Sequence, residues 1–131
     1  MADRKVHCLD TDSMTWSSLT PRGDSPKPRH GHLMVALGNK IYLHGGMAGA
    51  TFYDDLHILD LEKNTWSNVR KKRSNPPPRA AHEGVSHRGA VYMFGGMSGA
   101  GALDDAYKLN TGNIHICTKM GLPFFLVHLY T

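Results

Sequence analysis

The chain has 131 residues, 40% of them hydrophobic and 20% charged, a composition typical of one small folded domain and not of a disordered chain. Its net charge of +4 comes with no basic face interleaved with aromatic residues, which argues against a nucleic-acid partner. Two cysteines, no apolar run long enough to span a bilayer and no secretory signal together favour a cytoplasmic location, with peripheral membrane association still open.

Short apolar segments separated by Gly, Pro and Asn turns follow one another along the chain, and helical spacing fits none of them well. The prolines between them would also interrupt helices. The sequence therefore predicts an all-β fold. The expected strands are 5–10, 15–19, 32–37, 40–46, 55–62 and 65–69, and a second set of three strands follows fifty residues after 32–37, 40–46 and 55–62.

That second set reflects an internal repeat. When residues 8–57 are aligned with 58–107 without a gap, 18 of the 50 positions are identical. A period of fifty residues containing four short strands is typical of a repeated β-sheet unit. The repeated signature consists of Trp16 and Trp66, Arg29 and Arg79, Tyr42 and Tyr92, Gly45 and Gly46 with Gly95 and Gly96, and Asp54 and Asp55 with Asp104 and Asp105.

These elements, kept in one register, resemble the kelch-repeat family. The resemblance covers residues 3–111 and implies antiparallel four-stranded blades of a β-propeller. Since propellers close with four to eight blades, the chain is expected to form an incomplete propeller of about two and a half blades. From residue 112 onward the repeat register is lost, so 112–131 is interpreted as a divergent tail that comes from an alternative or prematurely ended transcript or an incomplete gene model, with a genuine specialised tail as the alternative.

Each signature residue has a structural interpretation. We expect both tryptophans to pack between blades, the glycine pairs to allow close backbone approach, and the aspartate pairs to stabilise the turn before the third strand. A phosphate-binding loop is disfavoured because the glycines lead into a strand and not a helix. No catalytic residue and no cofactor is expected.

Two local features allow a second interpretation. His30 and His32 could hold one side of a metal ion, although His32 recurs as His82 and so has a role in each repeat. The basic run 70–73 is expected to be a solvated loop, with a nuclear-import or anionic-membrane contact as the alternative.

The stretches 25–61 and 91–107 are similar to kelch-repeat effectors of Rab GTPases. This resemblance implies a non-enzymatic protein-interaction module that binds a GTP-bound Rab GTPase and serves endosome to trans-Golgi transport, peripheral on endosomal membranes. The alternatives are a substrate-recognition piece of a ubiquitin ligase and a non-functional truncated isoform. Loops at 20–31, 47–54, 70–81 and 97–104 are the expected contact surfaces, because propellers bind through loops carried on rigid blades.

The blade count also predicts weak folding. Both end blades are expected to expose apolar faces, since a repeat buries its faces only against neighbours. We therefore expect the isolated chain to self-associate and to become more soluble when 112–131 is removed.

Overall fold

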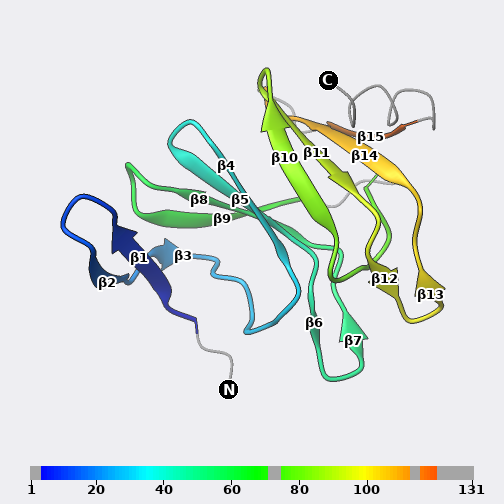
Figure 1. Cartoon of the computed structure of the whole chain (residues 1–131), viewed down its shortest axis with the longest axis horizontal. Coiled ribbons are helices and arrows are strands. Elements are labelled where there is room, and N and C mark those ends of the chain that lie inside the picture. Colours follow the sequence, from blue (N-terminus) through cyan, green and yellow to red (C-terminus); the bar gives the residue numbers. More distant parts are fainter. Residues whose placement is uncertain (1–3, 71–74, 113–115, 121–131) are drawn as a thin grey trace.

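The computed structural model describes residues 4–70, 75–112 and 116–120, with the backbone alone described for 116 and 117. Residues 71–73 of the basic run and most of the tail, 121–131, lie outside this description. Strands and turns make up the described part, which contains no helix. The predicted all-β fold, an incomplete propeller of about two and a half antiparallel blades, is confirmed (Figure 1).

The first sheet is a full blade in which four strands pair antiparallel in chain order. A short fifth strand, β3 (Arg22–Gly23), runs parallel to the outermost strand. The four blade strands are β4 (Leu33–Leu37), β5 (Lys40–His44), β8 (Leu56–Asp60) and β9 (Thr65–Val69).

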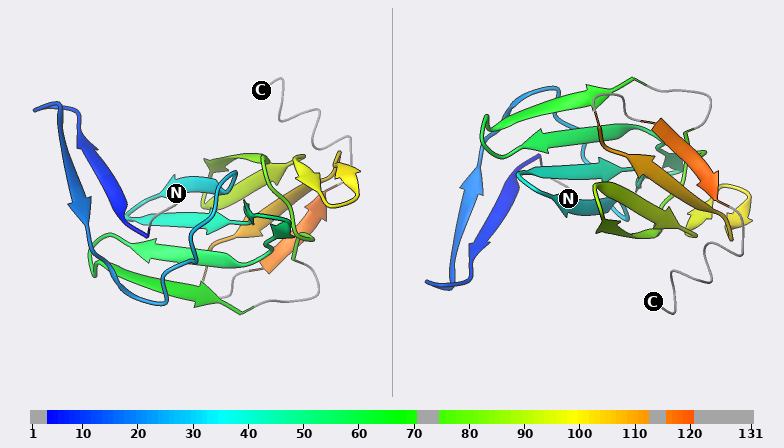
Figure 2. Two further views of the ribbon diagram at one scale, coloured as in Figure 1. Left: turned by 90° about the horizontal axis from the view of Figure 1, so that it is seen from below. Right: turned by 90° about the horizontal axis from the view of Figure 1, so that it is seen from above.

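The second sheet repeats this order and lies beside the first (Figure 2). The remaining half blade is an N-terminal hairpin that projects away from both sheets (Figure 2). The second sheet consists of β10 (Glu83–His87), β11 (Ala90–Phe94), β14 (Ala106–Asn110) and β15 (Ile116–Met120), and the hairpin of β1 (Val6–Asp10) and β2 (Thr15–Leu19).

Strand β15 lies inside the segment that the sequence assigned to a divergent tail. It pairs with β14 as β9 pairs with β8, so the second sheet has its fourth strand. The connection before β15 is one residue longer than the connection before β9, which places Cys117 opposite Leu109 as Trp66 is placed opposite Leu59. The repeated backbone pairing therefore continues past residue 111 although the sequence register is lost.

The main core lies between the two sheets. Alternate residues along each strand share a face, and the facing rows form one buried cluster. Burying a large aliphatic or aromatic side chain contributes about 1.5–3 kcal/mol. The cluster contains Leu33, Val35, Tyr42, Leu56 and Ile58 of the first sheet with Val91, Met93, Tyr107 and Leu109 of the second.

The outward face of the second sheet is more polar than expected. Glu83 and Lys108 stand where the first sheet has Leu33 and Ile58. Val85 remains 56% exposed on this face. The outward face is therefore mixed, because Val85, Tyr92 and Phe94 share it with the two charged residues, and the expectation that an end blade exposes apolar side chains holds for this sheet only in part.

The inner strands β4 and β10 approach too closely for a side chain at Gly84. A Cβ placed there would lie 2.6 Å from the carbonyl oxygen of Tyr92 and 2.8 Å from Leu33 Cδ2. Because both the backbone and the packed leucine would have to move, the glycine sets the distance between the two sheets.

We predict that Gly84→Ala lowers the free energy of unfolding by about 1–3 kcal/mol, the usual cost of overpacking. Urea denaturation measures the change. Gly99→Ala is the matched control, because a Cβ at Gly99 meets nothing within 4 Å. Equal stability of the two variants would contradict the proposed close approach.

Candidate functional site

A buried arginine binds several groups at the loop end of the first sheet. Arg29 is 7% exposed, and its guanidinium forms a two-point ion pair with Asp55, with Nη2 donating to Oδ2 at 2.9 Å. It also donates to the carbonyl oxygens of Lys27 and Gly45, each at 3.0 Å, and lies 4.1 Å from the centre of the Tyr53 ring. The guanidinium thus joins the loop before β4 to the ends of β5 and β8.

The same arrangement recurs fifty residues later. Arg79 is 0% exposed and pairs with Asp105 through Nη1 at 2.6 Å and Nη2 at 3.0 Å. It donates to the carbonyl oxygens of Pro77 and Gly95. Each repeat therefore holds its loops with one charged group, which the sequence analysis did not foresee.

These ion pairs correct the interpretation of the aspartates. The sequence assigned both members of each pair to the turn, whereas the structure places the second member, Asp55 or Asp105, against a buried arginine. Asp104 is exposed and Asp54 half-buried. The recurrence of the arginine and the aspartate at the same offset was the signal that could have revealed the pairing.

Both paired carboxyls are held in their ionised form. Burial opposes ionisation of Asp55, but hydrogen bonds from His57 and Arg29 outweigh it and lower its pKa. The hydrogen bond from Arg79 is the main cause that lowers the pKa of Asp105. Both carboxyls are therefore ionised and paired with arginine, an arrangement that suits structural support more than proton transfer.

The backbone of Arg79 also joins the two repeats. Its N–H donates to the carbonyl oxygen of Tyr53 at 3.1 Å, and its own carbonyl oxygen accepts from Gly46 N–H at 2.8 Å. At the equivalent Gly96, with φ +92°, a Cβ would lie 2.6 Å from the carbonyl oxygen of Ala80. This close approach is what the glycine pairs were expected to allow.

The two tryptophans differ in their surroundings. Trp66 is 4% exposed and packs with Leu43 and Leu59, with its ring edge-on to His57. Trp16 is 71% exposed, because β1 pairs only with β2 in the described part of the chain and no inner strands cover that hairpin. Of the two signature tyrosines, Tyr42 is buried between the sheets and Tyr92 lies half-buried on the outward face, with Lys108 over its ring.

A buried pair of histidines, which no pattern in the sequence indicated, lies between the sheets. His44 Nδ1 and His82 Nε2 are 3.0 Å apart, so one ring donates and the other accepts. Burial is the main cause that lowers the pKa of His44 to about 3 and that of His82 to about 4. His32 is half-buried and its pKa is also lowered by burial, whereas His30 is exposed. Across the described residues, no group of three or more His, Cys, Asp or Glu side chains is arranged to hold a metal ion.

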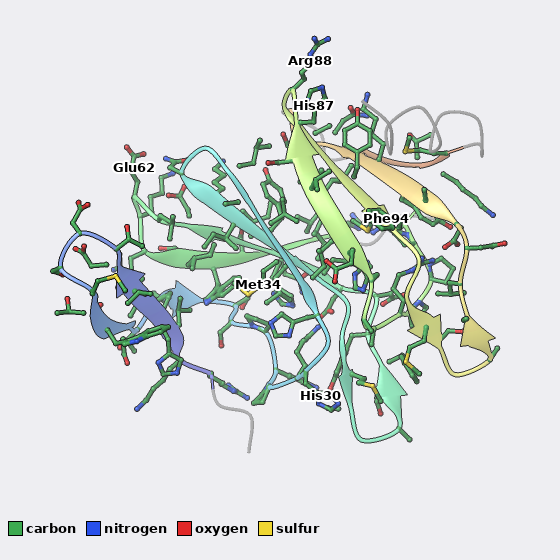
Figure 3. The ribbon with its side chains drawn as sticks, in the orientation of Figure 1. His30, Met34, Glu62, His87, Arg88 and Phe94 are labelled. Carbon is green, nitrogen blue, oxygen red and sulfur yellow. The ribbon has the colours of Figure 1, made fainter. Side chains whose placement is uncertain are left out.

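The four loops expected to make contacts form two joined pairs. A β-bridge between His30 and Met47 joins the first loop to the second, and one between Ala80 and Met97 joins the third to the fourth. Loops 47–54 and 97–104 form small hairpins that project side by side (Figure 1). Figure 3 shows His30 towards this end of the molecule and Arg88 at the opposite end. The hairpin strands are β6 (Met47–Ala48), β7 (Thr51–Phe52), β12 (Met97–Ser98) and β13 (Gly101–Ala102).

This loop surface, defined by His30, 47–53 and 97–103, carries little charge. Residues 45–53 and 95–103 include no Asp, Glu, Lys or Arg. Met97 is 44% exposed there. A weakly charged surface of small and apolar residues on rigid supports suits contact with another protein more than chemistry on a small substrate.

Two repeats with identical arginine–aspartate pairs, glycine pairs and four-stranded blades define a kelch-type propeller module. The sequence matches, over residues 1–117, the family described as the KLHDC2/KLHL20/DRC7 kelch-repeats domain, and the chain belongs to this family.

Several curated proteins are similar to part of this chain. The chain is 54% identical over 54 residues to the human Rab9 effector protein with kelch motifs, and this match covers 41% of the chain and 14% of the relative. The Xenopus laevis protein of the same name is 46% identical over 56 residues, 43% of this chain and 15% of the relative. A serine/threonine-protein phosphatase BSL2 of Arabidopsis thaliana is 41% identical over 49 residues, 37% of this chain and 5% of the relative. The chain thus covers a small fraction of each relative's length. Among the described residues, no helix has the length and apolarity needed to cross a bilayer.

The histidine pair gives a pH prediction. Since the pKa of His44 is about 3 in the folded chain and near 6.5 when unfolded, the unfolded state binds more protons below pH 6.5. Stability should therefore fall as the pH drops from 6.5 towards 3. For His44 alone the loss between pH 7.5 and pH 5 is about 2 kcal/mol, at 1.36 kcal/mol per pKa unit.

Urea unfolding of wild type and His44→Phe at both pH values measures this. The variant carries the residue found at the equivalent Phe94 and should lose about 2 kcal/mol of the pH dependence. If the stability of His44→Phe depends on pH as strongly as that of wild type, His44 is not the group responsible.

Proposed function

We propose that the chain is a non-enzymatic interaction module whose loop surface binds a Rab GTPase in its GTP-bound state. The observation that carries the proposal is the weakly charged loop surface, whose two hairpins are each joined by a β-bridge to a preceding loop that an arginine–aspartate pair anchors. Rigidly held loops lose little conformational entropy on binding. The likeness to Rab9 effector proteins with kelch motifs supports the choice of partner.

A peripheral role at endosomal membranes in vesicle transport follows from the same partner. A GTP-bound Rab would bring the chain to the membrane, with no anchor of its own required. The likeness to a serine/threonine-protein phosphatase covers only 5% of that relative's length, so its activity is not carried over to this chain.

Pull-down of the purified chain with GTP-loaded and GDP-loaded Rab9 tests the proposal. We expect retention on the GTP-loaded form only. Met97→Glu, which places a charge on the loop surface, should reduce retention at least tenfold. Arg88→Glu, at the opposite end of the molecule, should leave it unchanged (Figure 3).

Equal binding to both nucleotide states, or none, would contradict the proposal. Loss of binding in both variants would place the contact elsewhere. Co-purification of a cullin scaffold in place of the Rab would favour the ubiquitin-ligase alternative.

A further inference from the structure

The loop surface carries one exposed hydroxyl whose position suits chemical modification. Thr51 is exposed and lies in β7, directly after the tight turn that joins β6 to β7, where it pairs across the hairpin with Ala48. This hairpin projects from the two sheets (Figure 1). A Cβ at Gly49, in the turn itself, would meet nothing within 4 Å, so the space around the tip is open.

The hydroxyl of Thr51 makes no hydrogen bond to any other described residue. The second hairpin differs in this respect. There the hydroxyl of Ser98 accepts from the N–H of Ala100 at 3.2 Å and donates to the carbonyl oxygen of Gly101 at 3.5 Å, so it is used within its own turn. Gly101, which stands at the position equivalent to Thr51, has no side chain. Of the two hairpin tips, the first alone presents a hydroxyl to a second reactant.

Acidic residues follow Thr51 at a fixed distance. Asp54 is the third residue after it and Asp55 the fourth, and no other Ser or Thr of the chain has Asp or Glu three positions further on. Asp54 is half-buried, and the side chain of Asp55 stays 28% exposed although it is paired with Arg29. Protein kinases choose their substrates in part by such charge patterns.

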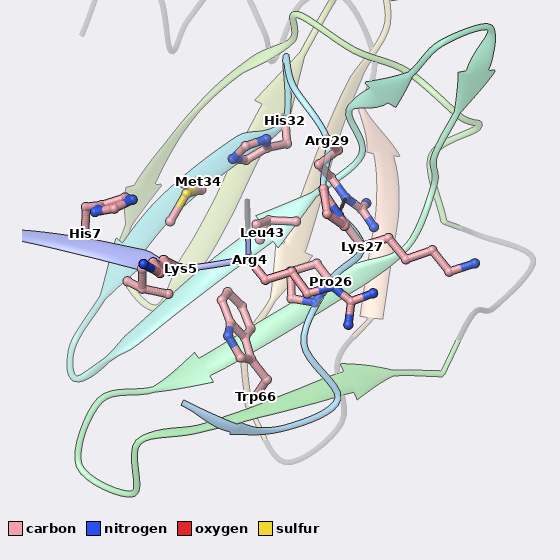
Figure 4. A pocket seen from close by; sticks show the side chains of 12 residues that line it. Arg4, Lys5, His7, Pro26, Lys27, Arg29, His32, Met34, Leu43 and Trp66 are labelled. Carbon is pink, nitrogen blue, oxygen red and sulfur yellow. Dashed lines mark hydrogen bonds between the residues drawn. The ribbon is translucent and has the colours of Figure 1, made fainter. Parts of the chain in front are cut away.

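Access also favours this position. A kinase has to place the acceptor hydroxyl in its own cleft, in line with the phosphate of ATP, and exposed loop tips are the parts of a fold that other enzymes reach most readily. The pocket of about 260 Å³ whose lining includes Met34 and Trp66 lies elsewhere, and none of the described residues that line it carries a hydroxyl (Figure 4).

We propose that Thr51 is a phosphorylation site for a serine/threonine kinase that selects an acidic residue three positions after the acceptor, and that its phosphorylation releases the partner of the loop surface. Thr51 Oγ1 forms a bond to the γ-phosphorus of ATP, and the bond from that phosphorus to the bridging oxygen of the β-phosphate breaks. ADP leaves with that bonding pair, and the hydroxyl proton passes to the catalytic base of the kinase.

Release follows from the charge that the modification adds. Residues 45–53 include no Asp, Glu, Lys or Arg. A phosphate brings a charge of about −1.5 to −2 and three strongly hydrated oxygens to this surface. A partner that contacts the uncharged surface would have to desolvate that group without an opposite charge from residues 45–53. The release rests on the proposed function, whereas the assignment of the acceptor does not.

The acceptor is tested on the full chain with a purified acidophilic kinase, casein kinase II, and magnesium ATP. We expect mass spectrometry to find one added phosphate, located on Thr51. Thr51→Ala should abolish incorporation and Thr51→Ser should retain it, and Ser98→Ala, on the sister hairpin, should leave it unchanged.

The role of the acidic residue has its own matched pair. Asp54→Asn should slow incorporation about tenfold, because it removes the charge that the kinase selects. Asp104→Asn makes the same change at the equivalent position of the next repeat and should leave the rate unchanged. Circular dichroism verifies that each variant is folded.

The release is tested by retention on GTP-loaded Rab9. The chain phosphorylated on Thr51 should be retained about tenfold less than the untreated chain. Thr51→Glu should also be retained less, whereas Thr51→Gln, which has the same size without the charge, should be retained as wild type.

No incorporation, incorporation at another residue, or an unchanged rate in Asp54→Asn would overturn the assignment of the acceptor. Equal retention of the phosphorylated and untreated chains would overturn the release. If the untreated chain is not retained on GTP-loaded Rab9, the proposed function fails and the release fails with it, while the site of incorporation still decides the assignment of Thr51.

Discussion

The ion pair between a buried arginine and the aspartate before the third strand is the interaction on which this structure depends. A guanidinium that is 0% exposed, as in Arg79, is costly unless every donor finds an acceptor. Asp105 and two backbone carbonyls meet that demand, and all three groups belong to loops. The requirement to satisfy one charge therefore fixes the path of several loop segments at once.

The position of this ion pair explains how the two repeats are joined. Arg79 holds its own blade through its side chain and the preceding blade through its backbone, which bonds to Tyr53 and Gly46. The apolar core between the sheets supplies most of the buried area, but it is not directional. Directional bonds at the loop end thus set the register of one blade against the next and hold the loop surface in place.

Much of this could be predicted from the sequence. Strand positions followed from alternation and turns, and the repeat followed from the fifty-residue offset. The arginine–aspartate partners lie 26 residues apart, so no local pattern showed their contact. The contact between His44 and His82 could not be predicted from the repeat, because Phe94 stands in the next repeat at the position of His44. Strand β15 was missed because strand pairing uses the backbone and tolerates a side-chain sequence that no longer repeats.

The most direct test is urea denaturation of Asp105→Asn beside Asp104→Asn, its exposed neighbour. If the buried ion pair controls the fold, Asp105→Asn lowers the free energy of unfolding by about 3–5 kcal/mol, because the guanidinium of Arg79 is left unpaired. Adding Arg79→Met should restore part of that loss, and Asp104→Asn should stay within about 0.5 kcal/mol of wild type. Equal stability of the two asparagine variants would contradict the account.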